Sequence, residues 1–125
     1  MYMVEAMKFQ GKVVRGKREG TKIGFPTANI EVEKEIEPGI YTGFTSILKT
    51  GPHDLPSMFY IAQNSQTIES HILDFQAADL YGTEISVDLK YKIRDIQVFN
   101  DLEIAKEQIK KDEAKAREWF KTHQD

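Results

Sequence analysis

Two polar side chains, Thr27 and Asn29, follow directly after a glycine-rich stretch that covers residues 16–24. Glycine permits backbone conformations and close approaches that a Cβ would forbid, and Pro26 then fixes φ at the end of the stretch. If Thr27 begins a strand, its hydroxyl and the Asn29 carboxamide project from the same face. Exposed backbone N–H groups of such a loop can bind an anion, and the side-chain oxygens suit a hard cation such as Mg²⁺. The alternative is a hairpin connection whose glycines serve turns.

A second candidate site lies in the strand predicted over residues 67–75. Glu69 and His71 alternate with apolar or small residues, so they share one face of this strand. A carboxylate beside a histidine in mid-strand can act as a general base. The alternative is the exposed polar face of a half-buried strand. His53 and His123 are too scattered along the chain to form a metal site with His71.

The composition excludes several classes of protein. The chain has 125 residues, of which 40% are hydrophobic and 30% charged, as in an ordinary globular domain. It contains no cysteine, which excludes disulfides, thiolate nucleophiles and cysteine-ligated metals. The net charge of −3 argues against general nucleic-acid binding. No apolar run is long enough to span a membrane, and the first residues do not resemble a signal peptide, so we expect a cytoplasmic protein.

Hydrophobic periodicity predicts the elements that must position these residues. Residues 84–94 alternate strictly between apolar and polar side chains, which predicts a strand with one buried face. The other segments that we expect to be strands are residues 7–15, 28–32, 40–48, 57–62 and 67–75. Short, closely spaced strands followed by one helix predict an antiparallel β-barrel with a C-terminal α-helix packed on it, in a single domain over residues 1–125.

The pattern changes at Asn100, which we expect to cap the helix together with Glu103. Apolar residues then recur at helical spacing up to Phe120. Asp112 lies on the apolar line of this helix. A buried carboxylate needs a partner, such as a backbone N–H or an arginine, so we interpret Asp112 as structural.

Several motifs of the chain resemble those of the riboflavin kinase family, and they occur in the same order. The glycine-rich stretch and the P-T-A-N sequence after it, residues 16–29, are similar to the signature of this family. Further similar segments are P-G-I-Y at 38–41, E-S-H-I-L-D-F at 69–75, D-L-Y-G at 79–82, I-R-D with a following phenylalanine at 93–99, and Q-I-x-x-D with a following alanine at 108–116. The similarity covers about residues 9–120.

The resemblance implies a six-stranded Greek-key barrel and transfer of the ATP γ-phosphoryl group to the ribityl 5′-hydroxyl of riboflavin, giving FMN and ADP. By position in the motifs, Glu69 would accept the hydroxyl proton. Thr27 and Asn29 would ligate Mg²⁺, with Zn²⁺ or Mn²⁺ as alternatives. The residues implied at the nucleotide and its phosphates are Gly16, Gly20, Lys22, Gly24, Pro26, Thr27 and Asn29. The residues implied at the flavin are Arg94, Phe99 and Ile109.

The resemblance also implies that Arg94 lies in a mobile loop, where it would reach the transferred phosphate or the product FMN. The helix that starts at Asn100 would form one wall of the flavin site. The partners implied are the small molecules riboflavin and ATP, with no nucleic acid and no membrane, and the protein is expected to be a monomer. Since no adenylyltransferase domain precedes Met1 in this sequence, we expect FAD synthesis to need another protein.

Three departures from the family pattern favour an alternative function. Glu19 stands where an arginine is common, and Ile96 occupies an acidic position. The segment 61–67 is shorter than the usual hairpin before the glutamate and lacks its glycine and proline. The alternative is a catalytically degenerate kinase-like module that binds a flavin or nucleotide, or regulates a partner, without turnover.

Overall fold

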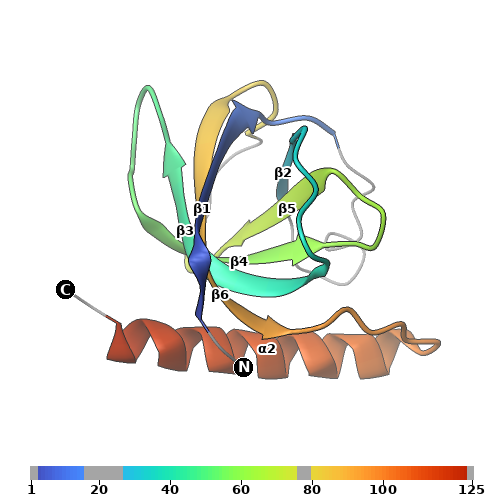
Figure 1. Cartoon of the computed structure of the whole chain (residues 1–125). Helices are drawn as coiled ribbons and strands as arrows, with labels where there is room; N and C mark the ends of the chain where they lie inside the picture. Colours follow the sequence, from blue (N-terminus) through green and yellow to red (C-terminus); the bar gives the residue numbers. More distant parts are fainter. Residues whose placement is uncertain (1–2, 16–26, 76–79, 124–125) are drawn as a thin grey trace.

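The structure, a computed structural model, describes residues 3–15, 27–75 and 80–123 of the chain. In these residues, six strands form one antiparallel sheet and one helix follows them (Figure 1). The elements are β1 (Met3–Lys12), β2 (Ala28–Glu31), β3 (Gly39–Ile47), β4 (Leu55–Ile61), β5 (Thr67–Ile72), β6 (Glu84–Arg94) and α2 (Leu102–Thr122). Each strand predicted from the sequence is present, with ends that differ by a few residues.

The strands are ordered β1-β6-β3-β4-β5-β2 in the sheet. Strands β3, β4 and β5 form consecutive hairpins, and β6 returns to lie beside β3, which is the Greek-key arrangement. An isolated bridge between Val14 and Asn29, whose N–H···O bond measures 2.8 Å, brings the chain after β1 to β2. The sheet is thereby nearly closed, and the predicted six-stranded barrel with a C-terminal helix is confirmed.

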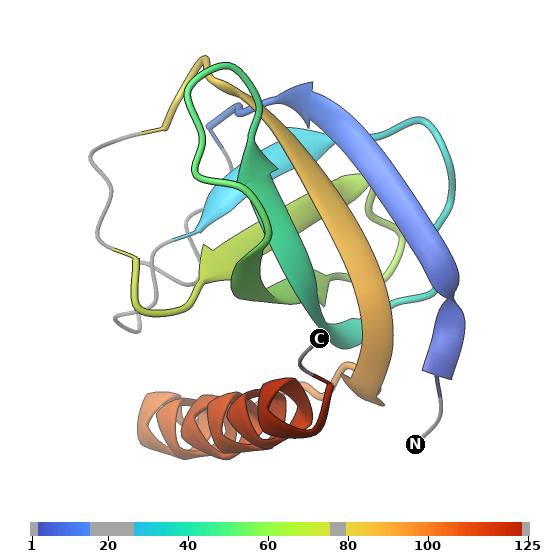
Figure 2. The same cartoon turned by 90° about the vertical axis from the view of Figure 1, so that its left-hand side faces the viewer.

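Two apolar clusters hold this fold together. The barrel interior contains fully buried residues from β2 to β6, among them Ile30, Tyr41, Phe59, Ile68 and Leu89. A second cluster joins the outer side of the barrel to α2 through Ile40, Met58, Leu73, Ile93 and Ala116. In two perpendicular views the helix lies beside the end of the barrel where β6 ends (Figures 1 and 2).

Three hydroxyl groups inside the barrel connect its central strands. Thr45 on β3 forms hydrogen bonds of 2.8 Å with both Ser57 on β4 and Ser70 on β5, and all three residues are buried. A slip of one residue would turn each side chain to the other face of its strand and would leave these hydroxyl groups unpaired. The hydroxyl triad therefore favours the observed register, in which Glu69 faces outward.

The N-terminus of α2 corrects one prediction. Asp101, and not Asn100, is the capping residue, because its carboxylate accepts a hydrogen bond of 2.8 Å from the Glu103 N–H. Both residues have side chains that can cap a helix, so the sequence pattern does not decide between them. Leu102, which the helical spacing would bury, is about half exposed.

Gly43 is a position in β3 where the barrel leaves no room for a side chain. A Cβ at this residue would collide with the backbone carbonyl of Asp88 on the neighbouring strand, next to a shift in the β3–β6 register. Gly43→Ala is therefore expected to lower the free energy of unfolding by about 3 kcal/mol or more, because backbone and not a flexible side chain must move. Urea denaturation measures this change.

Gly11→Ala is the matched control for that substitution. A Cβ at Gly11 would meet the Ile30 side chain at 3.4 Å, which is an ordinary contact. Its effect on the free energy of unfolding is expected to stay below about 1 kcal/mol. Equal effects of the two alanines would contradict the steric explanation.

Candidate active site

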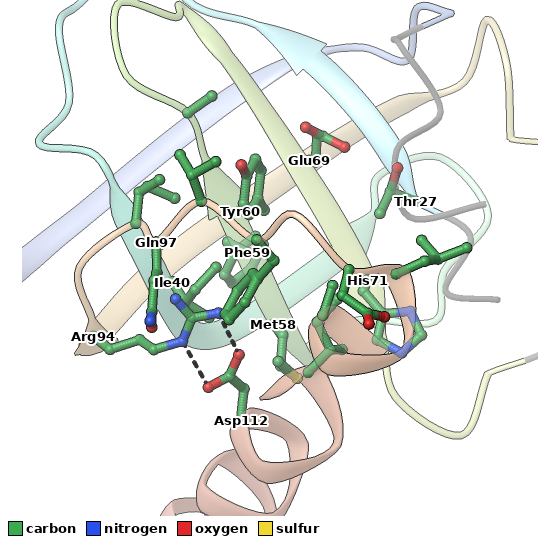
Figure 3. A pocket seen from close by; sticks show the side chains of 18 of the residues that line it. Thr27, Ile40, Met58, Phe59, Tyr60, Glu69, His71, Arg94, Gln97 and Asp112 are labelled. Carbon is green, nitrogen blue, oxygen red and sulfur yellow. Dashed lines mark hydrogen bonds and ion pairs between the residues drawn. The ribbon is translucent and has the colours of Figure 1, made fainter. Parts of the chain in front are cut away.

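A pocket of about 640 Å³ lies between the outer face of the barrel and the segment that leads into α2 (Figure 3). Cavities of this volume are typical of small-molecule sites. The lining residues from the barrel include Thr27, Ile40, Met58, Tyr60, Glu69 and His71. The opposite wall consists of residues from 94–102 together with Ala105, Ile109 and Asp112 of α2.

Strand pairing explains how this surface is built. Asn29 pairs with Glu69, Glu69 with Tyr60, Tyr60 with Ile40, and Ile40 with Arg94. Residues paired directly across antiparallel strands project from the same face, so these five side chains form one row over five strands. We call it the cross-strand row. It brings Glu69 beside Asn29, although the two residues are far apart in the sequence.

Thr27 and Asn29 each carry a buried oxygen that has no hydrogen-bond partner in the part of the chain that the structure describes. Neither Thr27 Oγ1 nor Asn29 Oδ1 has a partner among the residues that the structure describes. Buried polar atoms in this state are rare and cost free energy. Hydroxyl and carboxamide oxygens are ligands for a hard cation, so these two residues fit a Mg²⁺ ion. The described residues contain no group of three or more His, Cys, Asp or Glu that could hold a metal.

Glu69 and His71 share the outer face of β5, as their spacing predicts, and both line the pocket. Glu69 lies beside Thr27 at one end of the pocket in Figure 3. His71 Nε2 lies 3.8 Å from Glu113 Oε1 on α2. His71 is thus directed toward the helix, while Glu69 lies beside the two unpartnered oxygens.

Arg94 lies at the end of β6 and not in a loop, which corrects the expected location. Its Nε donates to Asp112 Oδ1 at 2.9 Å, and its second terminal nitrogen donates to Oδ2 at 2.8 Å. Asp112 is completely buried and also accepts a hydrogen bond from Gln108 at 3.0 Å. The prediction that Asp112 needs a partner such as an arginine is therefore confirmed.

A second arginine–aspartate pair joins α2 to the barrel, and in this pair the arginine and not the aspartate belongs to the helix. Arg117 on the helix donates to both carboxylate oxygens of Asp74, at 2.7 and 3.0 Å. Unlike Asp112, Asp74 is exposed, with 74% of its side chain accessible. Arg117 also contacts Glu113 at 3.3 Å. The two arginine–aspartate pairs thus attach the helix to the barrel at one buried point and one exposed point.

The exposed pair predicts a pH dependence of stability. The hydrogen bonds from Arg117 hold the pKa of Asp74 below its ordinary value of 3.8. A carboxyl group whose pKa is lower in the folded state than in the unfolded state stabilises the fold at pH values above its unfolded-state pKa. This stabilisation is lost as the pH falls through the pKa of the folded state. We expect Asp74→Asn to melt at a lower temperature than the wild type at pH 7, and the difference to shrink below about pH 4.

Thermal melts of both proteins between pH 2 and pH 7 measure this difference. Asp54→Asn is the control, because it makes the same chemical change at an exposed loop residue. A difference between wild type and Asp74→Asn that stays constant down to pH 2 would contradict the assignment of this pH dependence to Asp74.

The structure brings several other predicted residues to the same pocket. Phe99 and Ile109, which the resemblance implies at the flavin, both line it. Ile96 lines it as well and packs against the apolar cluster under α2. The remaining predicted residues, Gly16, Gly20, Lys22, Gly24 and Pro26, lie outside the described residues.

Sequence reasoning missed the residues of β3 and β4 that line the pocket. Ile40, Met58 and Tyr60 carry no chemical signature, and only the register of β3, β4 and β5 places them beside Glu69. The short connection between β4 and β5 turns without a glycine, because Asn64 adopts a left-handed conformation with φ of 57°.

The riboflavin kinase family model, Flavokinase, matches residues 3–120 of the chain. The chain belongs to the riboflavin kinase family.

Riboflavin kinase relatives with curated names are similar over most of the chain. A bifunctional riboflavin kinase/FMN adenylyltransferase of Escherichia coli (strain K12) is 41% identical over 118 residues, which cover 88% of this chain and 37% of that protein. An RNA-binding riboflavin kinase of Bacillus subtilis (strain 168) is 34% identical over 110 residues, which cover 82% of this chain and 46% of that protein. The chain thus spans less than half the length of these relatives.

Solved structures show the same fold. A riboflavin kinase from Trypanosoma brucei matches with a TM-score of 0.77 at 23% identity, over 99% of this chain and 84% of that one. A structure described as a macrolide-efflux protein from Streptococcus pneumoniae matches with a TM-score of 0.78 at 28% identity, over 90% of this chain and 38% of that one. Among the described residues, no helix is both long and apolar enough to cross a bilayer.

Proposed function

We propose that this chain transfers the γ-phosphoryl group of ATP to the 5′-hydroxyl of riboflavin, with FMN and ADP as products. Membership of the riboflavin kinase family supports this activity. The structural observation that carries it is the convergence of Glu69 with two unpartnered oxygens, those of Thr27 and Asn29, on one face of the barrel.

Glu69 is the residue that we assign as general base. Phosphoryl transfer requires a positioned hydroxyl, neutralised phosphate charge and a group that accepts the hydroxyl proton. In the proposed step Glu69 accepts the proton of the 5′-hydroxyl as the O–H bond breaks. The hydroxyl oxygen forms a bond to the γ-phosphorus, and ADP leaves with the oxygen that bridged the β- and γ-phosphorus atoms. The carboxylate must lie within hydrogen-bond reach of this hydroxyl, which places the ribityl end of riboflavin at the Glu69 end of the pocket.

Thr27 and Asn29 are the residues that we assign to the metal–nucleotide complex. A Mg²⁺ ion bound there with the nucleotide would neutralise charge on the phosphate oxygens. Both side chains are neutral, so the ligand oxygens of the phosphates must supply the compensating negative charge. Binding would also give the two buried oxygens the partners that they lack among the described residues.

The apolar wall is the surface that we assign to the flavin ring. Ile40, Met58, Ile96, Phe99 and Ile109 line the pocket and offer the kind of surface that buries a planar ring system. We further propose that the protein is a cytoplasmic monomer that acts on small molecules. Its net charge of −3 supports the proposal that it binds neither nucleic acid nor membrane.

The second candidate is a binding module without turnover. Ile96 favours it, because an apolar residue stands where the family motif is acidic. Protein incubated with riboflavin, ATP and MgCl₂ and analysed by chromatography distinguishes the two. FMN that accumulates with time supports the kinase, whereas riboflavin that binds without FMN formation supports the module.

A further inference from the structure

Tyr60 brings a hydroxyl group from β4 into the pocket lining. In the cross-strand row it stands between Glu69 on β5 and Ile40 on β3, and all three residues line the pocket (Figure 3). The other residues of β4 that line the pocket, Met58 and Phe59, are apolar. Within this fully described strand, Tyr60 is thus the one lining residue whose side chain can form a hydrogen bond with a ligand.

The short connection after β4 adds no polar side chain to this part of the pocket. Of residues 62–66, all of which the structure describes, Ala62 alone lines the pocket, and its methyl group forms no hydrogen bond. Gln66, which ends the connection, donates from Nε2 to the Glu33 carbonyl at 3.2 Å. Among the side chains of β4 and its connection, the polar contact to a ligand is therefore left to Tyr60.

The position of Tyr60 matches the middle of a riboflavin molecule bound in the proposed orientation. The 5′-hydroxyl is assigned to Glu69, and the ring to the apolar wall that includes Ile40. The backbone of Tyr60 lies one strand spacing, about 4.8 Å, from each of these two residues. The ribityl chain joins the ring to the 5′-hydroxyl, so we expect it to pass beside Tyr60.

The chemistry of the two groups is complementary. The ribityl chain carries secondary hydroxyl groups on C2′, C3′ and C4′, and each loses water when the flavin enters the pocket. A polar group that is buried without a new partner costs free energy. A phenolic hydroxyl both donates and accepts, so Tyr60 can bind a substrate hydroxyl together with a partner inside the protein.

We propose that Tyr60 is a specificity-determining residue whose hydroxyl forms a hydrogen bond with a secondary hydroxyl of the ribityl chain. This inference rests on the proposed function, because it assumes that the pocket holds riboflavin with its 5′-hydroxyl at Glu69. It assigns to Tyr60 a preference for a flavin with a polyol side chain over a flavin whose chain has the same length but only the terminal hydroxyl.

Two substrates that differ only in the secondary hydroxyls test the proposal. Riboflavin is compared with 7,8-dimethyl-10-(5-hydroxypentyl)isoalloxazine, which keeps the ring, the chain length and the terminal hydroxyl. Initial rates give kcat/KM for phosphorylation of each by the wild type and by Tyr60→Phe. We expect Tyr60→Phe to lower kcat/KM for riboflavin by about three- to tenfold, the factor that one neutral hydrogen bond contributes. For the hydroxypentyl flavin, kcat/KM should stay unchanged or rise, because this substrate has no secondary hydroxyl to pair with Tyr60.

A purely structural role of Tyr60 gives a different pattern. Tyr60→Phe would then lower kcat/KM for both flavins by the same factor, since a displaced pocket wall affects every substrate that contacts it. That result overturns the proposal, and so does an unchanged kcat/KM for riboflavin. Because phenylalanine keeps the ring, we expect the variant to fold, and a thermal melt checks this.

Tyr91→Phe is the matched control, because it removes the same hydroxyl group from a tyrosine outside the pocket lining. Tyr91 lies on β6, where its ring stacks on that of Trp119 with 6.1 Å between the centroids. Its loss of a hydroxyl should leave the ratio of kcat/KM between the two flavins at the wild-type value. A ratio that changes as much in Tyr91→Phe as in Tyr60→Phe would overturn the assignment to Tyr60.

Dissociation constants from quenching of flavin fluorescence separate this inference from the proposed function. A wild type that binds neither flavin rejects both. A wild type that forms FMN, combined with the same ratio of kcat/KM in Tyr60→Phe, rejects the role of Tyr60 alone. A wild type that forms no FMN but binds riboflavin more tightly than the hydroxypentyl flavin, with this preference lost in Tyr60→Phe, supports the role of Tyr60 and rejects the kinase.

Discussion

Glu69→Gln is expected to lower kcat for FMN formation by about 10²- to 10⁴-fold, the range that a positioned general base contributes. The amide keeps the shape of the side chain but cannot accept the proton of the ribityl hydroxyl. Glu69 is not part of the buried core of the barrel, so the fold and the binding of riboflavin should be retained. Initial rates at saturating riboflavin and ATP, followed by chromatography of FMN, measure the effect.

The control for this substitution is Glu84→Gln, which makes the same chemical change at the first residue of β6, outside the pocket lining. It should form FMN at the wild-type rate. If Glu69→Gln also turns over within a few-fold of the wild type, Glu69 is not the base, and proton transfer must be assigned to another group.

Asn29→Ala is expected to lower activity at limiting Mg²⁺ by about 100-fold, because loss of even an indirect partner of a metal ligand costs 10- to 100-fold. The concentration of Mg²⁺ that gives half-maximal velocity should rise, and Thr27→Val should change it in the same direction. A titration of initial velocity against MgCl₂ at fixed ATP measures both. The same half-maximal concentration in the variants and the wild type would remove these residues from the metal site.

Asn29→Ala should not destabilise the protein in the absence of ligands. Asn29 Oδ1 is buried without a described partner, so its removal relieves a desolvation cost. The melting temperature should stay constant or rise while activity falls, which is the expected trade-off where a site is kept at the expense of stability. Glu31→Gln, at an exposed residue of the same strand, is the control for both measurements.

The fold could be predicted from the sequence because its signals are local. Strict alternation over residues 84–94 indicates one buried face, and the change to helical spacing after Asn100 marks the helix. The capping residue could not be predicted, because Asn and Asp cap helices about equally well and only the backbone geometry selects Asp101 over Asn100.

The site could be predicted only where residue type itself carries information. The resemblance pointed to Thr27, Asn29 and Glu69, and the structure brings them to one surface of the barrel. A buried carboxylate must be paired, so the need for a partner of Asp112 was visible in the sequence. That this partner is Arg94 depends on where the end of β6 meets α2, and no local pattern encodes that contact.

The cross-strand row has a consequence for what substitutions in the pocket can change. Its two ends, Asn29 and Arg94, belong to different strands, so the separation of their backbones is set by the number of strands between them, at about 4.8 Å for each step between hydrogen-bonded strands. Substitutions of lining residues change the shape and polarity of the pocket but not this separation of the backbones. The backbone length of this row is therefore a property of the chain topology, whereas the side chains that stand on it can be exchanged one at a time.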